Sequence, residues 1–355
     1  MPQVPERIVL PAGVDFPRTL YEVTAEFDRR LKEGKLANYR PIPTGFSPLD
    51  DYLGGGLQAE DLVLLGGPQG VGKTVAVLQM ARNVARSGRA AIVVCFEHSE
   101  VYLYHRLMGL ESIDPTSDDP QGMTRQALRE AVLRALEAER AVAGFEPATS
   151  DLPVVPEAKP KGEPSTVFGL DWVLAQVPGA QRAWEKLVPY WDHLCLGRGS
   201  SRRTTVDVLE KYVQWARSQG HDDVVLFVDY LQKVPHIPPI GVPEPDTLAR
   251  VGHVVAGLKD VALATGAPVV AVAAADEDGL RGGRIRLANL LGPSLVQYEC
   301  DTAIILNPAP GGQQRVVWSI EKNRSGPACI ELLFALHGQY FCFNPVAVSA
   351  EMPPG

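Results

Sequence analysis

A glycine-rich stretch, "LLGGPQGVGKT" at residues 64–74, ends in a lysine and a threonine. Its end fits the spacing G-x-x-x-x-G-K-S/T, with an aliphatic strand pattern before it and a helix pattern after it, which argues against a chance match. Such a loop surrounds phosphates with backbone N–H groups at the positive end of a helix. Lys73 would reach the β- and γ-phosphates, and the Thr74 hydroxyl would bind Mg²⁺. The predicted ATP site comprises Gly67, Pro68, Gln69, Gly70, Val71, Gly72, Lys73 and Thr74.

Acidic residues follow two further predicted strands. Asp229 ends the apolar run in "VVLFVDYLQ", where a carboxylate either caps the next segment or faces a metal-bound water, and the phosphate loop favours the Mg²⁺ role. Glu97 follows "AAIVVCF" and is the predicted carboxylate that orients or deprotonates the attacking water. Glu100 is the competing candidate, and its alternative role is to complement the dipole of the next helix. Ligands of parallel sheets bind at the carboxyl ends of the strands, where all these residues are expected.

The pattern around these residues predicts the elements that position them. Near-continuous Val, Ile and Leu runs at 62–67, 90–96, 224–231 and 268–274 alternate with helical patterns at 74–88, 124–142, 204–220 and 247–266. Segments 301–307, 315–323 and 329–343 follow as closing strands, the last two antiparallel. This alternation predicts an α/β fold, with a mostly parallel sheet covered by helices on both faces.

The ends of the chain and one insertion have a different composition. Residues 1–16 are predicted to be an arm and 346–355 a tail, and prolines between 146 and 165 predict a loop insertion. Within 17–40, one narrow apolar stripe (Leu20, Val23, Phe27 and Leu31) predicts an amphipathic helix that needs a surface to lie on.

Bulk composition limits the class of protein. The chain has 355 residues and a net charge of −8, which excludes a broadly basic nucleic-acid coat but not a local basic channel. No apolar run is long enough for a membrane span or a signal peptide, so we expect a cytoplasmic protein. The cysteines show no CxxC pair and are expected to be single thiols: Cys95, Cys195, Cys300, Cys329 and Cys342.

Taken together, four segments resemble the RecA-fold ATPases: residues 42–74, "CFEHSE", "FVDYLQKV" and "EKNRSGP". The chain looks most like the C-terminal motor domain of DnaB-type replicative helicases, over residues 41–345, and "VDYLQ" is the DnaB-like feature. The segment 17–40 resembles that family's linker helix, while "LGGGL" and "KNRSG" are equally similar to the RadA and KaiC branches.

The resemblance implies a RecA-like core that assembles as a ring, usually of six subunits, with ATP between neighbours. Glu97 then matches the catalytic glutamate. Lys322 and Arg324 match basic residues that enter the neighbouring subunit's site, where a planar cation offsets charge on the γ-phosphate. Read without the family, both residues fit surface charges at a turn.

Two departures from the family bear on function. Only about 16 residues of the sequence precede the linker-like helix, so we do not expect primase docking, nor a zinc finger or protease-like tail like those of RadA. A Ser-Gln sensor is expected after the strand at 268–274, but the chain has Ala273 and Ala274, followed by the acidic run "DED" at 276–278. Alanine cannot hydrogen-bond to phosphate, and acids in a channel would repel a nucleic-acid backbone.

The basic residues Arg281, Arg284 and Arg286 come next on a Gly-rich segment. They fit either a loop that contacts single-stranded DNA or a solvated turn that neutralises the acids. Two functions therefore remain open. The first is an oligomeric ATPase that binds and moves along single-stranded DNA, like a helicase; the second is a ring ATPase that regulates or assembles a protein partner without unwinding DNA.

Overall fold

The computed structural model describes residues 16–34, 39–114, 122–142, 170–238, 241, 243, 245–292, 294–311 and 314–346. The predicted arm, the proline-rich insertion at 146–165 and the tail lie outside these ranges, apart from a single residue of the arm and of the tail. The chain divides into two compact units, residues 1–40 and residues 41–355.

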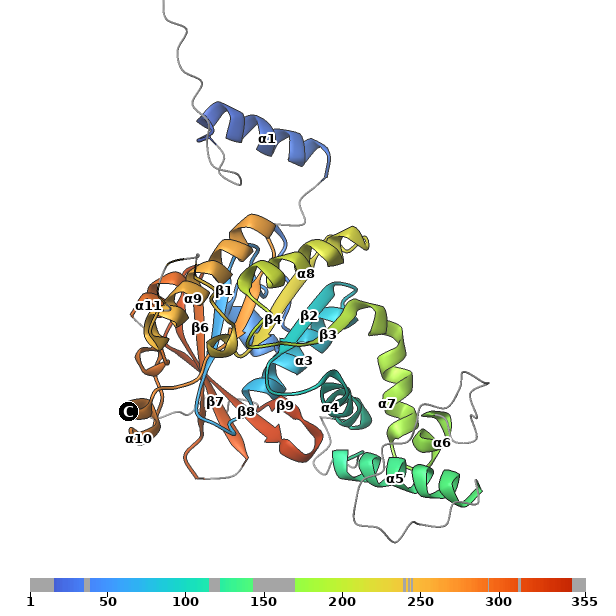
Figure 1. The fold of residues 1–355 in the computed structure, drawn as a ribbon. Coiled ribbons are helices and arrows are strands. Elements are labelled where there is room, and N and C mark those ends of the chain that lie inside the picture. Colours follow the sequence, from blue (N-terminus) through green and yellow to red (C-terminus); the bar gives the residue numbers. More distant parts are fainter. Residues whose placement is uncertain are drawn as a thin grey trace, which may run out of the picture. The chain divides into compact units, whose positions relative to one another are not determined.

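The first unit contains one helix, α1 (Leu20–Lys32), in its described part (Figure 1). Thr19 begins it with a capping box, because its side chain accepts a hydrogen bond from the backbone of Glu22 while Glu22 bonds back to Thr19. No residue of α1 is buried, and the exposed fraction of the apolar stripe is at least 41% at each position. The helix therefore forms from local interactions, and its apolar stripe is exposed within this unit.

The described part of the second unit contains one nine-stranded sheet, in the order β3-β2-β4-β5-β1-β6-β7-β8-β9. Strands from β3 to β6 in this order pair in parallel, and β6 to β9 pair antiparallel. This confirms the predicted mostly parallel sheet with antiparallel closing strands. The strands are β1 (Leu62–Gly66), β2 (Ala90–Cys95), β3 (Leu194–Arg198), β4 (Val224–Asp229), β5 (Val269–Val272), β6 (Thr302–Pro308), β7 (Arg315–Asn323), β8 (Ile330–His337) and β9 (Cys342–Pro345).

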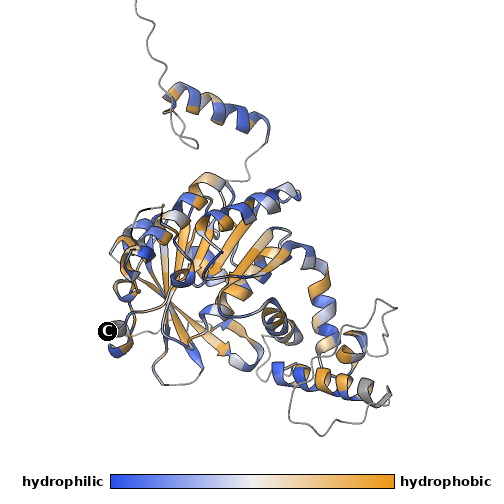
Figure 2. Ribbon diagram, viewed as in Figure 1, coloured by the Kyte–Doolittle hydropathy of each residue, from blue (hydrophilic) through white to orange (hydrophobic). Residues whose placement is uncertain are grey.

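Helices cover both faces of the sheet, and each face has its own hydrophobic core. Successive side chains of a strand point to opposite faces, and accordingly Leu62 and Leu64 belong to one core while Val63 and Leu65 belong to the other. Figure 2 shows the central strands as the most hydrophobic part of this unit. The α-helices of the unit are α2 (Ser47–Tyr52), α3 (Lys73–Arg86), α4 (Glu100–Ser112), α5 (Arg125–Val142), α6 (Leu170–Ala175), α7 (Ala180–Leu187), α8 (Val206–Ser218), α9 (Thr247–Thr265), α10 (Glu277–Arg281) and α11 (Leu295–Glu299).

Two of the strands differ from the sequence prediction. The segment 329–343 is not one strand but two, β8 and β9, because a 3-10 turn (η5, Gly338–Tyr340) reverses the chain between them. Strand β3 lies at the edge of the sheet, is only partly buried and has no continuous aliphatic run. Its sequence pattern therefore did not predict a strand. Over the described residues, no helix has both the length and the apolar character needed to cross a bilayer.

Candidate functional site

The phosphate loop between β1 and α3 has backbone angles that require glycine. Gly67, Gly70 and Gly72 have φ values of +146°, +80° and +102°. A Cβ atom on Gly67 would lie 2.4 Å from the carbonyl oxygen of Leu306, and one on Gly72 would lie 2.7 Å from the Phe343 ring. A Cβ on Gly70 would meet no atom of the described residues within 4 Å. Two glycines are therefore fixed by close packing beneath the loop, and the third lies at its open side.

Lys73, the first residue of α3, holds this loop closed. Its ammonium group donates hydrogen bonds of 2.8 Å to the carbonyl oxygens of Gly67 and Pro68. Burial lowers the pKa of Lys73, while the nearby carboxylates of Asp229 and Glu97 act in the opposite direction. A partly buried ammonium bonded only to neutral carbonyls in its own loop is well matched to a phosphate anion.

Asp229 ends β4 next to Thr74, and its side chain is almost completely buried. Burial raises the pKa of Asp229, and a hydrogen bond with the Thr74 side chain opposes that shift. A hydroxyl and a carboxylate paired beside the phosphate loop form the oxygen donor set that Mg²⁺ takes together with phosphate oxygens. The residues present therefore fit the predicted Mg²⁺–ATP group.

Glu97 lies beside this pair because of the strand register. Cys95 of β2 is aligned with Asp229 of β4, so the chain that leaves β2 emerges at the same edge. Glu97 is exposed and close enough to interact electrostatically with Lys73 and Asp229. The sequence thus brings four charged or polar groups to one place from three strands or their following segments.

Glu100, the competing carboxylate, has a different task. It is the first residue of α4, and its side chain accepts a hydrogen bond of 2.9 Å from the backbone N–H of Arg198 at the end of β3. The helix is capped by Ser99, whose side chain accepts a bond from Tyr102. Glu100 therefore ties α4 to the edge of the sheet, and the geometry favours Glu97 for contact with a water at the phosphate.

Arg106 on α4 was not singled out by the sequence. Its positive charge acts to lower the pKa of Asp229, so the two groups lie near each other. Its guanidinium lies over the rings of Tyr102 and Phe341, at 4.7 and 5.0 Å from their centroids. The Nε and Nη1 atoms of Arg106 are buried and have no hydrogen-bond partner among the residues that the structure describes. Buried donors without a partner, beside a carboxylate, are suited to bind an anionic ligand. The sequence did not predict this role, because a single arginine within a helix is not part of a recognisable motif.

The basic residues of "EKNRSG" lie at the other end of the sheet. Thr302 of β6 is aligned both with Val63 at the start of β1 and with Asn323 at the end of β7. The phosphate loop follows the opposite end of β1. Lys322 and Arg324 therefore flank a residue at the amino-terminal edge of the parallel strands, remote from the phosphate loop of their own chain.

Both basic side chains have partners within the chain. Lys322 donates to the carbonyl oxygens of Gln297, at 2.7 Å, and Cys300, so it satisfies carbonyl groups at the end of α11. Arg324 forms an ion pair of 3.1 Å with Asp301, although 54% of its side chain remains exposed.

The segment after β5, where the sequence lacks the expected Ser-Gln sensor, is held in place by the side chain of Gln232. The side-chain oxygen of Gln232 accepts a hydrogen bond of 3.1 Å from the backbone of Ala274, and its nitrogen donates to the carbonyl of Leu291 at 3.1 Å. Leu290 packs so closely on Gly66 that an added Cβ there would lie 2.5 Å from it. The segment 274–291 is therefore anchored beside the strand that leads into the phosphate loop.

Arg284 and Arg286, which were proposed to contact DNA, are paired with carboxylates. Arg284 forms an ion pair with Glu331, and Arg286 forms one of 3.3 Å with Glu321. Their side chains are 41% and 56% exposed. Arg281 lies at the end of the short helix α10. Both paired arginines keep exposed surface, but part of their charge is offset within the chain.

The sheet order and the phosphate loop define an ATPase fold of the RecA type. The chain resembles the DnaB-type branch of that class: residues 41–141 match the family model described as the DnaB-like helicase C-terminal domain. A solved DnaB-like replicative helicase, studied with its interactions with primase, superposes with a TM-score of 0.64 at 15% identity, covering 93% of this chain and 67% of that one. A solved ATPase domain superposes with a TM-score of 0.63 at 16% identity over 93% of this chain and 100% of its own.

Curated relatives match short segments. DNA repair protein RadA of Mycobacterium tuberculosis is 47% identical over 60 residues, which is 17% of this chain and 12% of RadA. Protein RecA of Leifsonia xyli is 31% identical over 111 residues, which is 29% of this chain and 31% of RecA. The chain thus spans less than a third of each relative's length in these alignments, so they support the fold more than a shared activity.

Proposed function

We propose that this chain is an Mg²⁺-dependent ATPase that works as a homo-oligomer, in a ring of six, and acts in the cytoplasm on single-stranded DNA. The observation that carries the proposal is the separation of two groups on one sheet. The phosphate loop with Asp229 lies at one edge, and Arg324 with Lys322 lies at the other. A chain with this arrangement completes an ATP site only together with a neighbour.

The residues at the phosphate-loop edge have separate roles in this proposal. Lys73 and the loop N–H groups bind the β- and γ-phosphates, while Thr74 and Asp229 hold Mg²⁺, which offsets charge on the phosphate oxygens. Glu97 accepts a proton from the attacking water. Arg106, with buried unpaired donors near Asp229, stabilises the negative charge on the phosphate.

The neighbouring copy supplies the remaining cations. Arg324 reaches the γ-phosphate bound by the next subunit, and Lys322 lies beside it. A planar guanidinium suits this task because it spreads its charge over several donors. Over half of the Arg324 side chain is exposed, which leaves it accessible to a second copy.

Substitutions at the phosphate loop test hydrolysis first. We expect Lys73→Ala and Glu97→Gln each to abolish phosphate release from ATP, with Glu97→Gln still binding nucleotide. Wild-type turnover in both variants would refute the ATPase. The neighbour's role is tested by mixing Arg324→Ala chains into the wild-type protein, which should lower turnover below simple dilution; a linear decrease would contradict an arginine that acts in trans.

A specific observation keeps the second function in view. Arg284 and Arg286 are already paired with carboxylates, and Ala273 and Ala274 replace the polar sensor, so a ring ATPase that acts on a protein partner competes with the DNA motor. Measuring the ATPase rate as a function of single-stranded DNA concentration, at two salt concentrations, distinguishes these two functions. A stimulation that weakens with salt supports DNA as the ligand, and no response at any DNA concentration favours the protein partner.

A further inference from the structure

Asp301, directly before β6, is a buried carboxylate remote from the phosphate loop, and its side chain accepts three hydrogen bonds. Its side chain is only 5% exposed. One oxygen, Oδ2, accepts a hydrogen bond of 2.8 Å from the backbone N–H of Leu62 and one of 2.7 Å from the ammonium of Lys259. The other oxygen, Oδ1, accepts a bond of 3.1 Å from Arg324. The two oxygens therefore have different partners.

Oδ2 anchors the carboxylate. Leu62 begins β1, and Lys259 belongs to α9, where it also donates to the carbonyl oxygen of Glu60. A carboxylate bound to a strand and a helix at once has little freedom to move. Because Lys259 offsets the charge of Asp301, the pairing through Oδ1 does not cancel the charge of Arg324.

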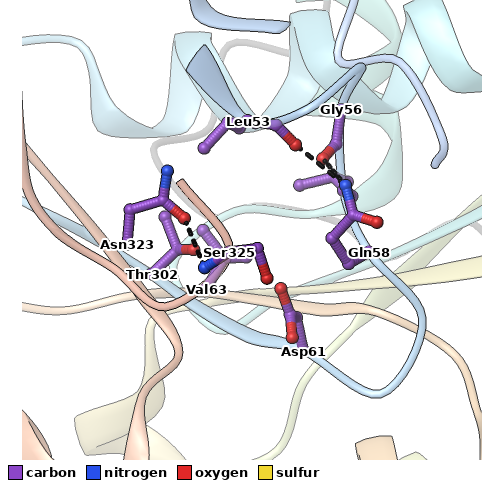
Figure 3. Close-up of a pocket in the computed structure, with 9 residues that line it drawn as sticks. Leu53, Gly56, Gln58, Asp61, Val63, Thr302, Asn323 and Ser325 are labelled. Carbon is purple, nitrogen blue, oxygen red and sulfur yellow. Dashed lines mark hydrogen bonds between the residues drawn. The ribbon is translucent and has the colours of Figure 1, made fainter. Parts of the chain in front are cut away.

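The backbone of Arg324 is fixed on the same anchor. Its N–H donates to the Asp301 carbonyl oxygen at 3.0 Å. The preceding residue, Asn323, donates to the carbonyl oxygen of Tyr52 at 3.0 Å and accepts from the N–H of Ser325 at 3.1 Å. Figure 3 shows Asn323 and Ser325 lining a narrow pocket against the 53–58 loop. The turn that carries Arg324 is thus braced on both sides.

The guanidinium itself is held at two points. Nη1 bonds to Asp301, and Nη2 donates to the carbonyl oxygen of Tyr298 at 2.8 Å. An arginine has five N–H donors, so these two bonds leave three to bind a phosphate. A free arginine side chain would lose much rotamer freedom on reaching a neighbour's site, and this arrangement removes that freedom in advance.

We propose that Asp301 is the positioning residue for Arg324: it fixes the guanidinium in the direction from which it enters the neighbouring subunit's ATP site. The inference rests on the proposed function, in which Arg324 acts in trans. Asp301 touches no nucleotide and acts through Arg324 alone.

The test is a double-mutant cycle on kcat with the full chain, ATP and Mg²⁺. Asp301→Asn can keep its oxygen toward Leu62 and Lys259 while it turns an NH₂ group toward Arg324. We expect it to lower kcat about 10- to 100-fold with little change in KM, because misplacing a reacting group by about 1 Å has effects of this size. In the Arg324→Ala background, Asp301→Asn should lower kcat less than about twofold further, because its target is gone.

Two control variants separate positioning from folding. Lys259→Met loosens the anchor of Asp301, so it should lower kcat in the wild-type background with little further effect in the Arg324→Ala background, whereas a loss of stability alone would lower kcat equally in both. Asp301→Glu keeps the carboxylate and should retain part of the activity that Asp301→Asn loses. Melting temperatures of all variants are measured by circular dichroism.

The outcomes are distinct. If Arg324→Ala lowers kcat but both Asp301 variants turn over like wild type, or if the effect of Asp301→Asn is the same with and without Arg324, the positioning role is overturned and the proposed function stands. If Arg324→Ala itself keeps wild-type kcat, the proposed trans arginine fails, and the role of Asp301 fails with it.

Discussion

Asp61, which precedes β1, has a raised pKa that makes the stability of the fold depend on pH. Burial is the main cause, and repulsion from Asp301 adds to it, while Lys259 and Arg324 oppose it; together they raise the pKa of Asp61 from 3.8 to about 6. The folded state therefore holds this proton more tightly than the unfolded state. As the pH rises through about 6, the folded chain must carry a poorly solvated carboxylate, and stability falls.

The substitution Asp61→Asn removes this penalty. A pKa raised from 3.8 to about 6 corresponds to about 3 kcal/mol above pH 6, and the partial exposure of the side chain reduces this to about 1–2 kcal/mol by solvent screening. We therefore expect the variant to be about 1–2 kcal/mol more stable than wild type at pH 8, and about half as much at pH 5, where the unfolded carboxyl is still mostly ionised.

Urea unfolding followed by circular dichroism at pH 5 and pH 8 measures the difference. Asp51→Asn, the same chemical change at an exposed position of α2, is the matched control and should change the free energy of unfolding by less than about 0.5 kcal/mol at either pH. A gain in Asp61→Asn that is equal at both pH values, or a loss of stability at pH 8, would show that the buried charge is not the cause.

Three further predictions concern the phosphate loop and its surroundings. Mg²⁺–ATP at a hundredfold excess over its Kd should stabilise the wild type by about 2.7 kcal/mol, measured by thermal shift, and neither Lys73→Ala nor wild type with excess EDTA should show the full effect. Gly67→Ala places a Cβ 2.4 Å from the Leu306 carbonyl, so it should cost about 1–3 kcal/mol in urea unfolding and abolish binding of a fluorescent ATP analogue; unchanged binding would contradict the strained-loop argument. Gln232→Ala leaves the Ala274 N–H without its partner and should cost about 1–3 kcal/mol, with faster hydrogen exchange confined to segment 274–291; exchange spread over the whole sheet would count against a local anchor.

Residues with local signals were predictable from the sequence. The prediction of the phosphate loop rests on the spacing of its glycines before Lys73 and Thr74, and the prediction of Asp229 rests on the apolar strand that it ends. In both cases the signal lies within a few residues of the site. The alternation of Val-rich strands with helical patterns predicted the sheet, and β7 occupies its predicted range.

Long-range partners were not predictable in this way. Glu331 and Glu321, which pair with Arg284 and Arg286, lie on β8 and β7, and only the folded sheet brings them together. The role of Arg106 depends on its proximity to Asp229, which is distant in sequence. The role of Gln232 depends on its hydrogen bond to the backbone of Ala274, which lies beyond the next helix. A single sequence does not carry these pairings, because each depends on strand order and register.

The antiparallel return of β7 has a consequence for how activity depends on concentration. It carries Arg324 to the far end of the same sheet that presents the phosphate loop, so under the proposed function a lone chain has two half-sites that cannot meet. Under the proposed mechanism, hydrolysis per chain vanishes on dilution and rises with association until every half-site is matched. Subunit association is then the event that starts catalysis, and mass action limits ATP consumption by unassembled chains without a separate inhibitor.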